Sequence, residues 1–214
     1  MLDKPTRQGR PPTFSREERR QRILAAASQV FLGRGYTNAS IDDVVKACGM
    51  SKKTVYQAFD SKEHLFRELV EAEIAKAPDL QNLGTAIRGA ENHLRYAFQQ
   101  IAEFIFSDHQ VALARLVVTE SPTSPELSAI FYEKAVLTGR AMLTDTLRAL
   151  MVEGEISGPQ QPEELADILM GGLLGRDFFA VLISRTTPPS KEAIAERVTR
   201  LLRFIQPALK GNVA

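Results

Sequence analysis

The chain has 214 residues, 44% of them hydrophobic, which is enough to fill one large core or a small and a larger one, and this excludes a chain that is disordered throughout. Its single cysteine, Cys48, excludes an intrachain disulfide and a cysteine-based zinc cluster, and it is typical of a reducing compartment such as the cytoplasm. The net charge is only +1, but residues 1–64 hold 12 Lys or Arg against 7 Asp or Glu, so this basic end is the candidate for binding nucleic acid.

Residues 1–14 are predicted to form a flexible arm, because they contain three prolines and little apolar material. Arg7 and Arg10 of this arm have two interpretations of equal weight. They enter the minor groove of DNA beside the main contact, or they belong to a tail that adds only general positive charge.

Four helices are predicted to follow the arm. Each begins at a short polar residue whose side chain can accept from a free backbone N–H group, and the predicted N-caps are, in order, Ser15, Ser40, Ser51 and either Asp60 or Ser61. Gly35 and Gly49 end the first and second helices. Two short helices joined by a tight glycine-containing turn, with a longer helix in front, predict a helix-turn-helix unit whose third helix is the recognition helix.

The predicted recognition helix separates an apolar face from a polar one. Val55 and Phe59 lie at i and i+4 and therefore share the buried face. The remaining side chains gather hydrogen-bond donors near the N-terminal turn, where backbone N–H groups already favour an anion. We therefore expect contacts with phosphate or base edges from Lys52, Lys53, Thr54, Tyr56 and Gln57. The alternatives are that Tyr56 only packs and that the two lysines are ordinary solvated charges.

Beyond residue 83 the helical periods continue without a convincing strand, so the predicted fold class is all-α. The expected helices cover residues 85–106, 110–120, 125–153, 162–185 and 191–209. The predicted domains are the arm at 1–14, the helix-turn-helix domain at 15–62, a connecting helix and linker at 63–82, and a larger C-terminal helical domain at 83–214.

The most apolar stretch, residues 168–183, is interrupted by Arg176 and Asp177 and is short for a membrane span, so it is predicted to be a buried helix. A helical wheel gives it two apolar faces, one with Leu169, Gly172 and Leu173 together with Ala180. Two faces need two covers, which a domain core and a twofold partner would supply. The embedded Arg176–Asp177 pair is interpreted as an interface ion pair in preference to a ligand anchor.

The sequence FLGRGYTNAS, followed by IDDVVKACGMSKKTVYQAFDSKEHLF, resembles the TetR family of bacterial transcriptional regulators over about residues 15–66. The resemblance implies a homodimer that binds a pseudo-palindromic DNA operator, usually as a repressor, and that is released by a small molecule in its C-terminal domain. It also implies that the last two helices form the dimer interface, here with Leu169, Gly172, Leu173, Arg176 and Ala180. Carried over by position, it makes Ser51, Lys52, Lys53, Thr54, Tyr56 and Gln57 the recognition contacts, and it places on phosphates Thr37, Ser40 and Lys62.

For an effector pocket the sequence offers only candidates, and plain core is an equal alternative for each of them. They are Phe98, Phe104 and Phe131, with Phe106 and Tyr132, and with Arg115 or Glu120 as a polar anchor. They favour an apolar or aromatic effector. The scattered histidines predict no metal site, no cofactor motif is present, and no catalytic set converges, so we expect no enzyme. The alternatives are a DNA-binding adaptor controlled by a protein partner and a small all-α enzyme.

Overall fold

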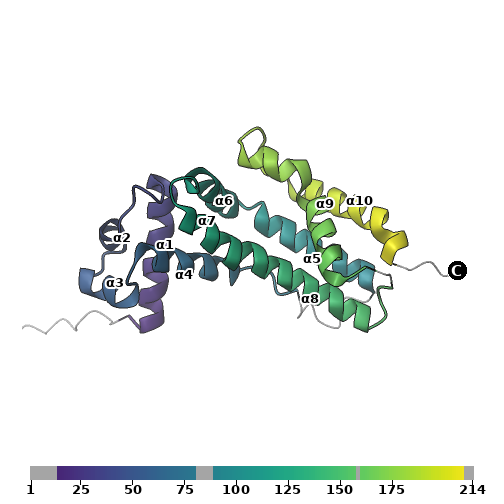
Figure 1. Cartoon of the computed structure of the whole chain (residues 1–214), viewed down its shortest axis with the longest axis horizontal. Coiled ribbons are helices and arrows are strands. Elements are labelled where there is room, and N and C mark those ends of the chain that lie inside the picture. Colours follow the sequence, from purple (N-terminus) through teal and green to yellow (C-terminus); the bar gives the residue numbers. More distant parts are fainter. Residues whose placement is uncertain (1–13, 81–88, 158–159, 210–214) are drawn as a thin grey trace, which may run out of the picture.

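The computed structural model describes residues 14–80, 89–157 and 160–209, and every secondary-structure element within these ranges is a helix (Figure 1). The predicted all-α class is therefore confirmed. Arg7 and Arg10, as well as the predicted helix start at residue 85, lie outside the described ranges. Within those ranges, no helix combines the length and the apolar character that a membrane crossing requires.

The N-terminal unit consists of α1 (Arg16–Arg34), α2 (Ile41–Cys48), α3 (Lys52–Ala58) and α4 (Lys62–Ile74). Its helix starts follow local hydrogen bonding. The Ser15 hydroxyl accepts from the Glu18 N–H group at 3.1 Å, and the Glu18 carboxylate accepts from the Ser15 N–H group at 2.7 Å, as a capping box requires. Ser61, one of two predicted caps of α4, accepts from the N–H group of His64. The predicted turn between α2 and α3 is confirmed at Gly49, whose φ of 67° is left-handed.

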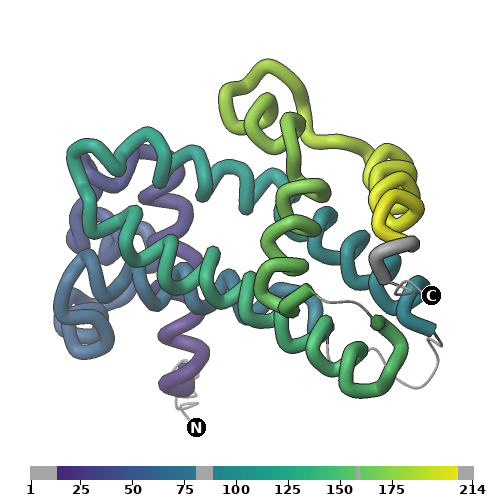
Figure 2. Tube along the Cα trace, turned by 45° about the vertical axis from the view of Figure 1, so that its right-hand side comes forward, coloured from purple at the N-terminus to yellow at the C-terminus, as the bar shows by residue number. Residues whose placement is uncertain are grey.

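The C-terminal unit consists of α5 (Ala90–Ile105), α6 (Asp108–Glu120), α7 (Pro125–Phe131), η1 (Tyr132–Leu137), α8 (Thr138–Val152), α9 (Pro162–Leu182) and α10 (Lys191–Leu209). The predicted helix over 125–153 is continuous, but one stretch of it, η1, is wound as a π-helix. Helix α10 returns across the domain and packs beside α5 (Figure 2).

Helix α9 departs from its prediction as one uninterrupted helix. It kinks at Gly175, where φ is 47° and ψ is −148°. Such a break leaves main-chain carbonyls without intrahelical partners. Arg197 of α10 provides hydrogen-bond donors for two of these carbonyls: its Nη1 donates at 3.0 Å to the carbonyls of Leu173 and Leu174. Its Nη2 pairs with Asp177. The kink is thus held by a neighbouring helix.

Two hydrophobic cores hold the molecule together. The first surrounds Phe31, Tyr36 and Phe66, whose rings pack edge-to-face or tilted, and it includes residues of α1 to α4 as well as Leu116 of α6 and Leu127 of α7. The second core joins α5, α8, α9 and α10, and α6 also contributes to it. Helices α6 and α7 therefore belong to the same core as the helix-turn-helix.

Polar contacts also join the two units, among them one between α6 and the α1–α2 loop and two between η1 and α4. Glu120, at the end of α6, accepts from the N–H group of Thr37 at 3.0 Å and from the Thr37 hydroxyl, in the loop between α1 and α2. Arg67 of α4 lies 3.2 Å from Glu133 of η1. Lys134 of η1 lies 3.0 Å from Glu71 of α4. The α1–α2 loop and α4 are thus both tied to the C-terminal unit.

Candidate functional site

Helix α3 presents the polar face that the sequence predicts. Val55 and Phe59 are 0% and 1% exposed and anchor the helix to the first core. Ser51 caps the helix by accepting from the Thr54 N–H group at 3.1 Å, and the hydroxyls of these two residues lie 2.8 Å apart. The exposed side chains are Lys52, Lys53, Tyr56 and Gln57, whereas Thr54 is half-buried. An exposed row of donors on a helix that is fixed from behind is suited to a nucleic-acid groove.

Asp42 of α2 organises this face, a role that sequence reasoning missed. Its carboxylate accepts from Lys52 Nζ at 2.9 Å and from the Tyr56 hydroxyl at 3.5 Å, and the Lys52 ammonium lies 5.4 Å from the centre of the Tyr56 ring. The hydrogen bond to Asp42 raises the pKa of Lys52, so Lys52 stays charged. Helical spacing does not reveal this contact, because it joins two helices across the turn between them.

The three predicted phosphate contacts already have protein partners. Ser40 caps α2, with its hydroxyl 2.6 Å from Asp43 Oδ2. Thr37 is bound to Glu120. Lys62 Nζ donates to the carbonyls of Tyr36 at 2.9 Å, Ala39 at 3.2 Å and Thr37 at 3.5 Å. An ammonium has three donors, so Lys62 is fully used in holding the loop before α2. The phosphate contacts of these residues stay predictions.

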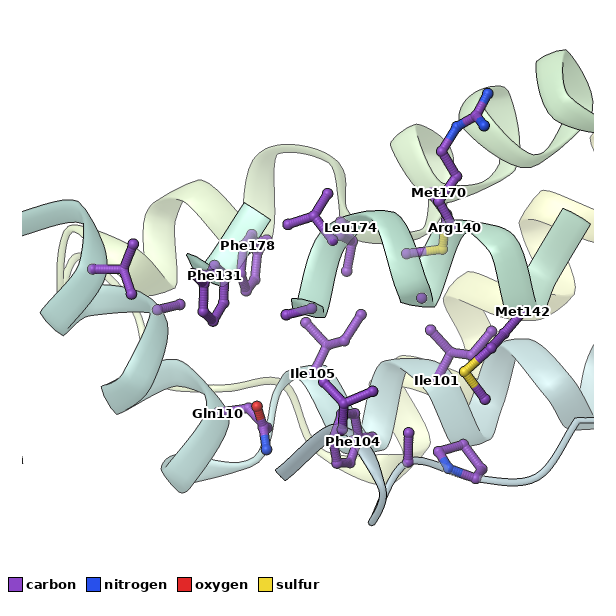
Figure 3. A pocket seen from close by; sticks show the side chains of 18 of the residues that line it. Ile101, Phe104, Ile105, Gln110, Phe131, Arg140, Met142, Met170, Leu174 and Phe178 are labelled. Carbon is purple, nitrogen blue, oxygen red and sulfur yellow. The ribbon is translucent and has the colours of Figure 1, made fainter. Parts of the chain in front are cut away.

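An apolar cavity of about 320 Å³ lies between α4, α5, α6, η1, α8 and α9 (Figure 3). Of the predicted pocket residues, Phe104 and Phe131 line it. Phe98 does not, because it is fully buried in the second core. Arg115 does not either: its Nε donates to the carbonyl of Leu182 at 3.1 Å and its Nη2 to that of Val181, at the C-terminal end of α9. Glu120, the other candidate anchor, is engaged with Thr37.

Sequence reasoning missed most of the cavity wall, which is assembled from distant segments. Most of the further lining residues are aliphatic, aromatic or thioether side chains of α4, α5, α6, η1, α8 and α9, and the polar ones are Gln110 and Arg140. The apolar ones include Ile74, Ile101, Val117, Met142, Met170, Leu174 and Phe178. Helical spacing marks such residues only as buried and does not distinguish the wall of a cavity from a filled core.

The predicted dimer face on α9 needs correction. Leu169 and Leu173 are 0% exposed and lie in the second core of the same chain, so they offer no surface to a partner. A Cβ added at Gly172 would lie 2.8 Å from Leu201 Cδ1, so this glycine permits close approach to α10 of the same chain. Leu169 and Leu173 share one face of α9, as predicted, but this face packs on the core of the same chain. Beyond the kink at Gly175 the core residue is Val181, and Ala180 is only half-buried.

The other two predicted interface residues, Arg176 and Ala180, differ in their exposure. Ala180 is half-buried, and the side chain of Arg176 is 92% exposed with its Nε 3.6 Å from Asp177 Oδ1. The apolar side chains that the last two helices do expose are Ile168, Phe179 and, beyond the end of α9, Ile183, together with Phe204 of α10. These residues offer an apolar surface that a partner could cover.

Comparison with known proteins gives this geometry a context. Residues 23–69 match the model of the bacterial regulatory proteins of the tetR family, and residues 92–206 match that of the AefR-like transcriptional repressor C-terminal domain. The HTH-type transcriptional activator FasR of Mycolicibacterium smegmatis is 32% identical over 120 residues. This match spans 53% of the chain and 52% of FasR, so the chain covers about half the length of that relative.

Solved structures of other proteins superpose on nearly the whole chain. The flavonoid-responsive regulator FrrA is 26% identical with a TM-score of 0.71, and the superposition covers 89% of this chain and 96% of that one. A TetR-family regulator from Mesorhizobium loti has a TM-score of 0.76 at 22% identity, covers 90% of this chain and 98% of its own, and shows the shared fold. FasR is thus a transcriptional activator and FrrA a regulator that responds to flavonoids. Because the C-terminal match alone spans more than half of the chain, the protein belongs to the TetR family of bacterial transcriptional regulators.

Proposed function

We propose that this protein is a cytoplasmic, homodimeric repressor that leaves its operator when an apolar or aromatic small molecule binds in the cavity. One observation carries the ligand part of the proposal: a cavity of about 320 Å³ with an almost wholly apolar wall. A space of this size is within the range of small-molecule sites, and an empty apolar cavity of this size lowers stability unless a ligand fills it. The repressor assignment follows the description of the matching C-terminal domain.

The position of the cavity supports a link to DNA binding. Its wall includes Ile74 of α4, and only three residues separate the end of α3 from the start of α4. It also includes Ala135 of η1, and the neighbouring Glu133 and Lys134 form ion pairs with α4. A ligand that changes the packing of α4 against η1 therefore acts on the helix that carries the recognition helix. Such a ligand shifts the population between a DNA-binding and a released conformer.

The dimer is proposed to form through the apolar side chains that the last two helices expose, Ile168 and Phe179 of α9 and Phe204 of α10, which is 84% exposed. Two recognition helices related by a twofold axis then face a pseudo-palindromic site. Arg176 and Ala180 are retained as proposed contacts at the edge of this interface.

The DNA part of the proposal is tested by selecting genomic fragments that bind the purified protein and sequencing them. Lys52→Ala and Tyr56→Phe are each expected to weaken binding to the selected operator by about 5- to 150-fold, because each removes one contact with a phosphate or base. Lys191→Ala is the matched control, since it removes one positive charge from α10 near Glu103, far from α3. Wild-type affinity in both α3 variants would contradict the assignment.

The ligand part is tested by calorimetric titration of a candidate effector with and without operator. Linkage requires that a ligand which weakens operator binding by some factor also binds the operator complex more weakly by the same factor, typically about 5- to 150-fold. Equal affinity in both titrations would exclude that compound as an inducer. If a broad screen of lipophilic and aromatic compounds yields no ligand, control by a protein partner becomes the better proposal.

A further inference from the structure

We infer that the cavity takes an uncharged apolar molecule carrying one hydrogen-bond donor, and that the side-chain oxygen of Gln110 accepts this bond. This inference rests on the proposed function, since it assumes that the cavity binds the effector. It adds the chemical class of the ligand, the residue that recognises its polar group, and a class of molecule that the site rejects.

The polar groups of the wall are few. Among the described residues that line the cavity, only Gln110 and Arg140 carry a nitrogen or oxygen in the side chain. Arg140 directs its guanidinium group away from Phe131 and Phe178, so that mainly its aliphatic stem faces the cavity (Figure 3). Its Nε and Nη2 donate to the two carboxylate oxygens of Asp167 at 2.6 and 2.9 Å, and this pairing raises the pKa of Arg140 and lowers that of Asp167. The charge of Arg140 is already compensated.

A ligand anion therefore finds no counter-charge among the described lining residues. Burying an ionised group in apolar surroundings without a partner is strongly unfavourable. Glu73, beside Gln110 and outside the lining, is 5% exposed, and its carboxylate is already paired with the Lys76 ammonium at 2.7 Å. His109 Nε2 lies 3.3 Å from the same carboxylate. The site is thus expected to disfavour ligands that carry a carboxylate deep inside the cavity.

The orientation of Gln110 decides which neutral group it can recognise. Its Nε2 lies 3.5 Å from Glu73 Oε2, and Lys76 Nζ lies 2.7 Å from the other oxygen of this carboxylate. An ionised carboxylate only accepts hydrogen bonds, so the amide nitrogen must face Glu73 and the amide oxygen lies on the other branch. No described donor of the protein is seen to reach this oxygen. Figure 3 shows the side chain extending from α6 toward Ile105 and Phe104.

The complementary group on the ligand is therefore a donor, such as a hydroxyl, a phenol or an amide N–H. Gln110 contacts Glu73 of α4, so only the side chain of Gln110 separates the ligand donor from α4. A hydrogen bond received by the amide oxygen polarises the amide and strengthens the bond that its N–H group donates. Ligand recognition by Gln110 thus tightens the contact between α6 and α4.

Three probes that differ in a single group test this inference by calorimetric titration of the full-length protein: biphenyl, 4-hydroxybiphenyl and biphenyl-4-carboxylate. The hydroxyl is expected to improve affinity over biphenyl by about 2- to 10-fold, the factor that one net hydrogen bond gives. The carboxylate is expected to bind roughly tenfold or more weakly than biphenyl. These two comparisons with biphenyl need no variant of the protein.

Gln110→Met then identifies the residue, because methionine keeps the length and the unbranched shape of glutamine and loses the amide. The advantage of 4-hydroxybiphenyl over biphenyl is expected to fall to about onefold, while biphenyl binds at least as tightly as before. Gln99→Met of α5 is the matched control, since Gln99 bonds to Glu103 and lies outside the cavity wall, and it is expected to keep the advantage.

The possible outcomes distinguish the inference about ligand class and Gln110 from the proposed function, ligand binding in the cavity, on which it rests. If none of the three probes binds, the proposed ligand cavity fails and the inference fails with it. If biphenyl and its hydroxyl derivative bind equally tightly, or the carboxylate binds best, the cavity stands and the assignment of ligand class is wrong. If the hydroxyl advantage survives in Gln110→Met, recognition by Gln110 is wrong.

Discussion

Replacement of Thr37 by valine distinguishes two roles of this residue. The family resemblance predicts a contact with a DNA phosphate, whereas in the structure the Thr37 hydroxyl donates to Glu120 at the end of α6. Valine keeps the shape of threonine and keeps the main-chain N–H group, which donates to the same carboxylate at 3.0 Å. The substitution therefore removes one hydroxyl and leaves the rest of the contact in place.

The loss is expected to lower the free energy of unfolding by about 1 kcal/mol. A hydrogen bond to a charged group contributes about 1.5–3 kcal/mol, and competition from solvent reduces this value at an exposed site. With a urea dependence of roughly 2–3 kcal/mol per molar, the midpoint of unfolding falls by about 0.3–0.5 M. The measurement is urea denaturation followed by circular dichroism at fixed protein concentration, because dimerisation makes the midpoint depend on concentration.

Thr119→Val is the control, since Thr119 is exposed on the same helix one residue before Glu120. Its midpoint is expected to stay close to that of the wild type. For Thr37→Val we expect the lower midpoint together with operator affinity within about twofold of the wild type. A variant that keeps the wild-type midpoint but binds the operator more than about fivefold more weakly would refute the structural role and support the phosphate contact.

Three further predictions follow from the same contacts. Asp42→Asn removes a negative charge and frees Lys52 to contact a phosphate. The slope of the logarithm of the binding constant for random DNA against the logarithm of salt concentration should therefore steepen by about 0.9. An unchanged slope in fluorescence anisotropy titrations would argue against the pairing of Lys52 with Asp42 in the free protein. Gly172→Leu should lower the stability measured by thermal unfolding by about 1–3 kcal/mol, because the leucine side chain would collide with Leu201. Gly172→Ala should be nearly neutral, since the atom nearest to the added methyl group is the end of the flexible Leu201 side chain. The hydroxyl and N–H group of Ser40 lower the pKa of Asp43 below 3.8, so its contribution to stability is complete above that pH and is lost as pH falls toward the lowered pKa. Asp43→Asn should therefore flatten the stability profile between about pH 5 and pH 3, and an unaltered profile counts against the cap.

The helix-turn-helix was predictable because its signals are local. Each of its helices begins at a serine that caps it through a residue three positions later, and Gly49 supplies the left-handed turn between α2 and α3. The spacing of Val55 and Phe59 alone determines which face of α3 is exposed. Each of these features depends on residues a few positions apart in the chain, so each can be predicted from the sequence alone.

The cavity and the α9 face depend on contacts between distant residues. Arg115 was a reasonable polar anchor by its place on α6, but the carbonyls at the end of α9, more than 60 residues away, take its guanidinium group. The direction of α9 changes at Gly175, and Arg197 of another helix stabilises the change. A helical wheel assumes a straight axis, so it could not relate the face of Leu169 and Leu173 to the residues beyond Gly175. It also does not show which of two apolar faces packs on the core.

The core that α6 shares with the helix-turn-helix limits how this protein can acquire a new ligand. Val117 faces the cavity and also belongs to the core around Phe31 and Phe66. A substitution at Val117 that reshapes the cavity also removes packing from the DNA-binding unit. Met142 and Met170 line the same cavity from α8 and α9, outside that core, and their flexible side chains tolerate exchange. Divergence of ligand preference is therefore easiest on the far wall, while the wall next to the DNA-binding unit must stay nearly constant.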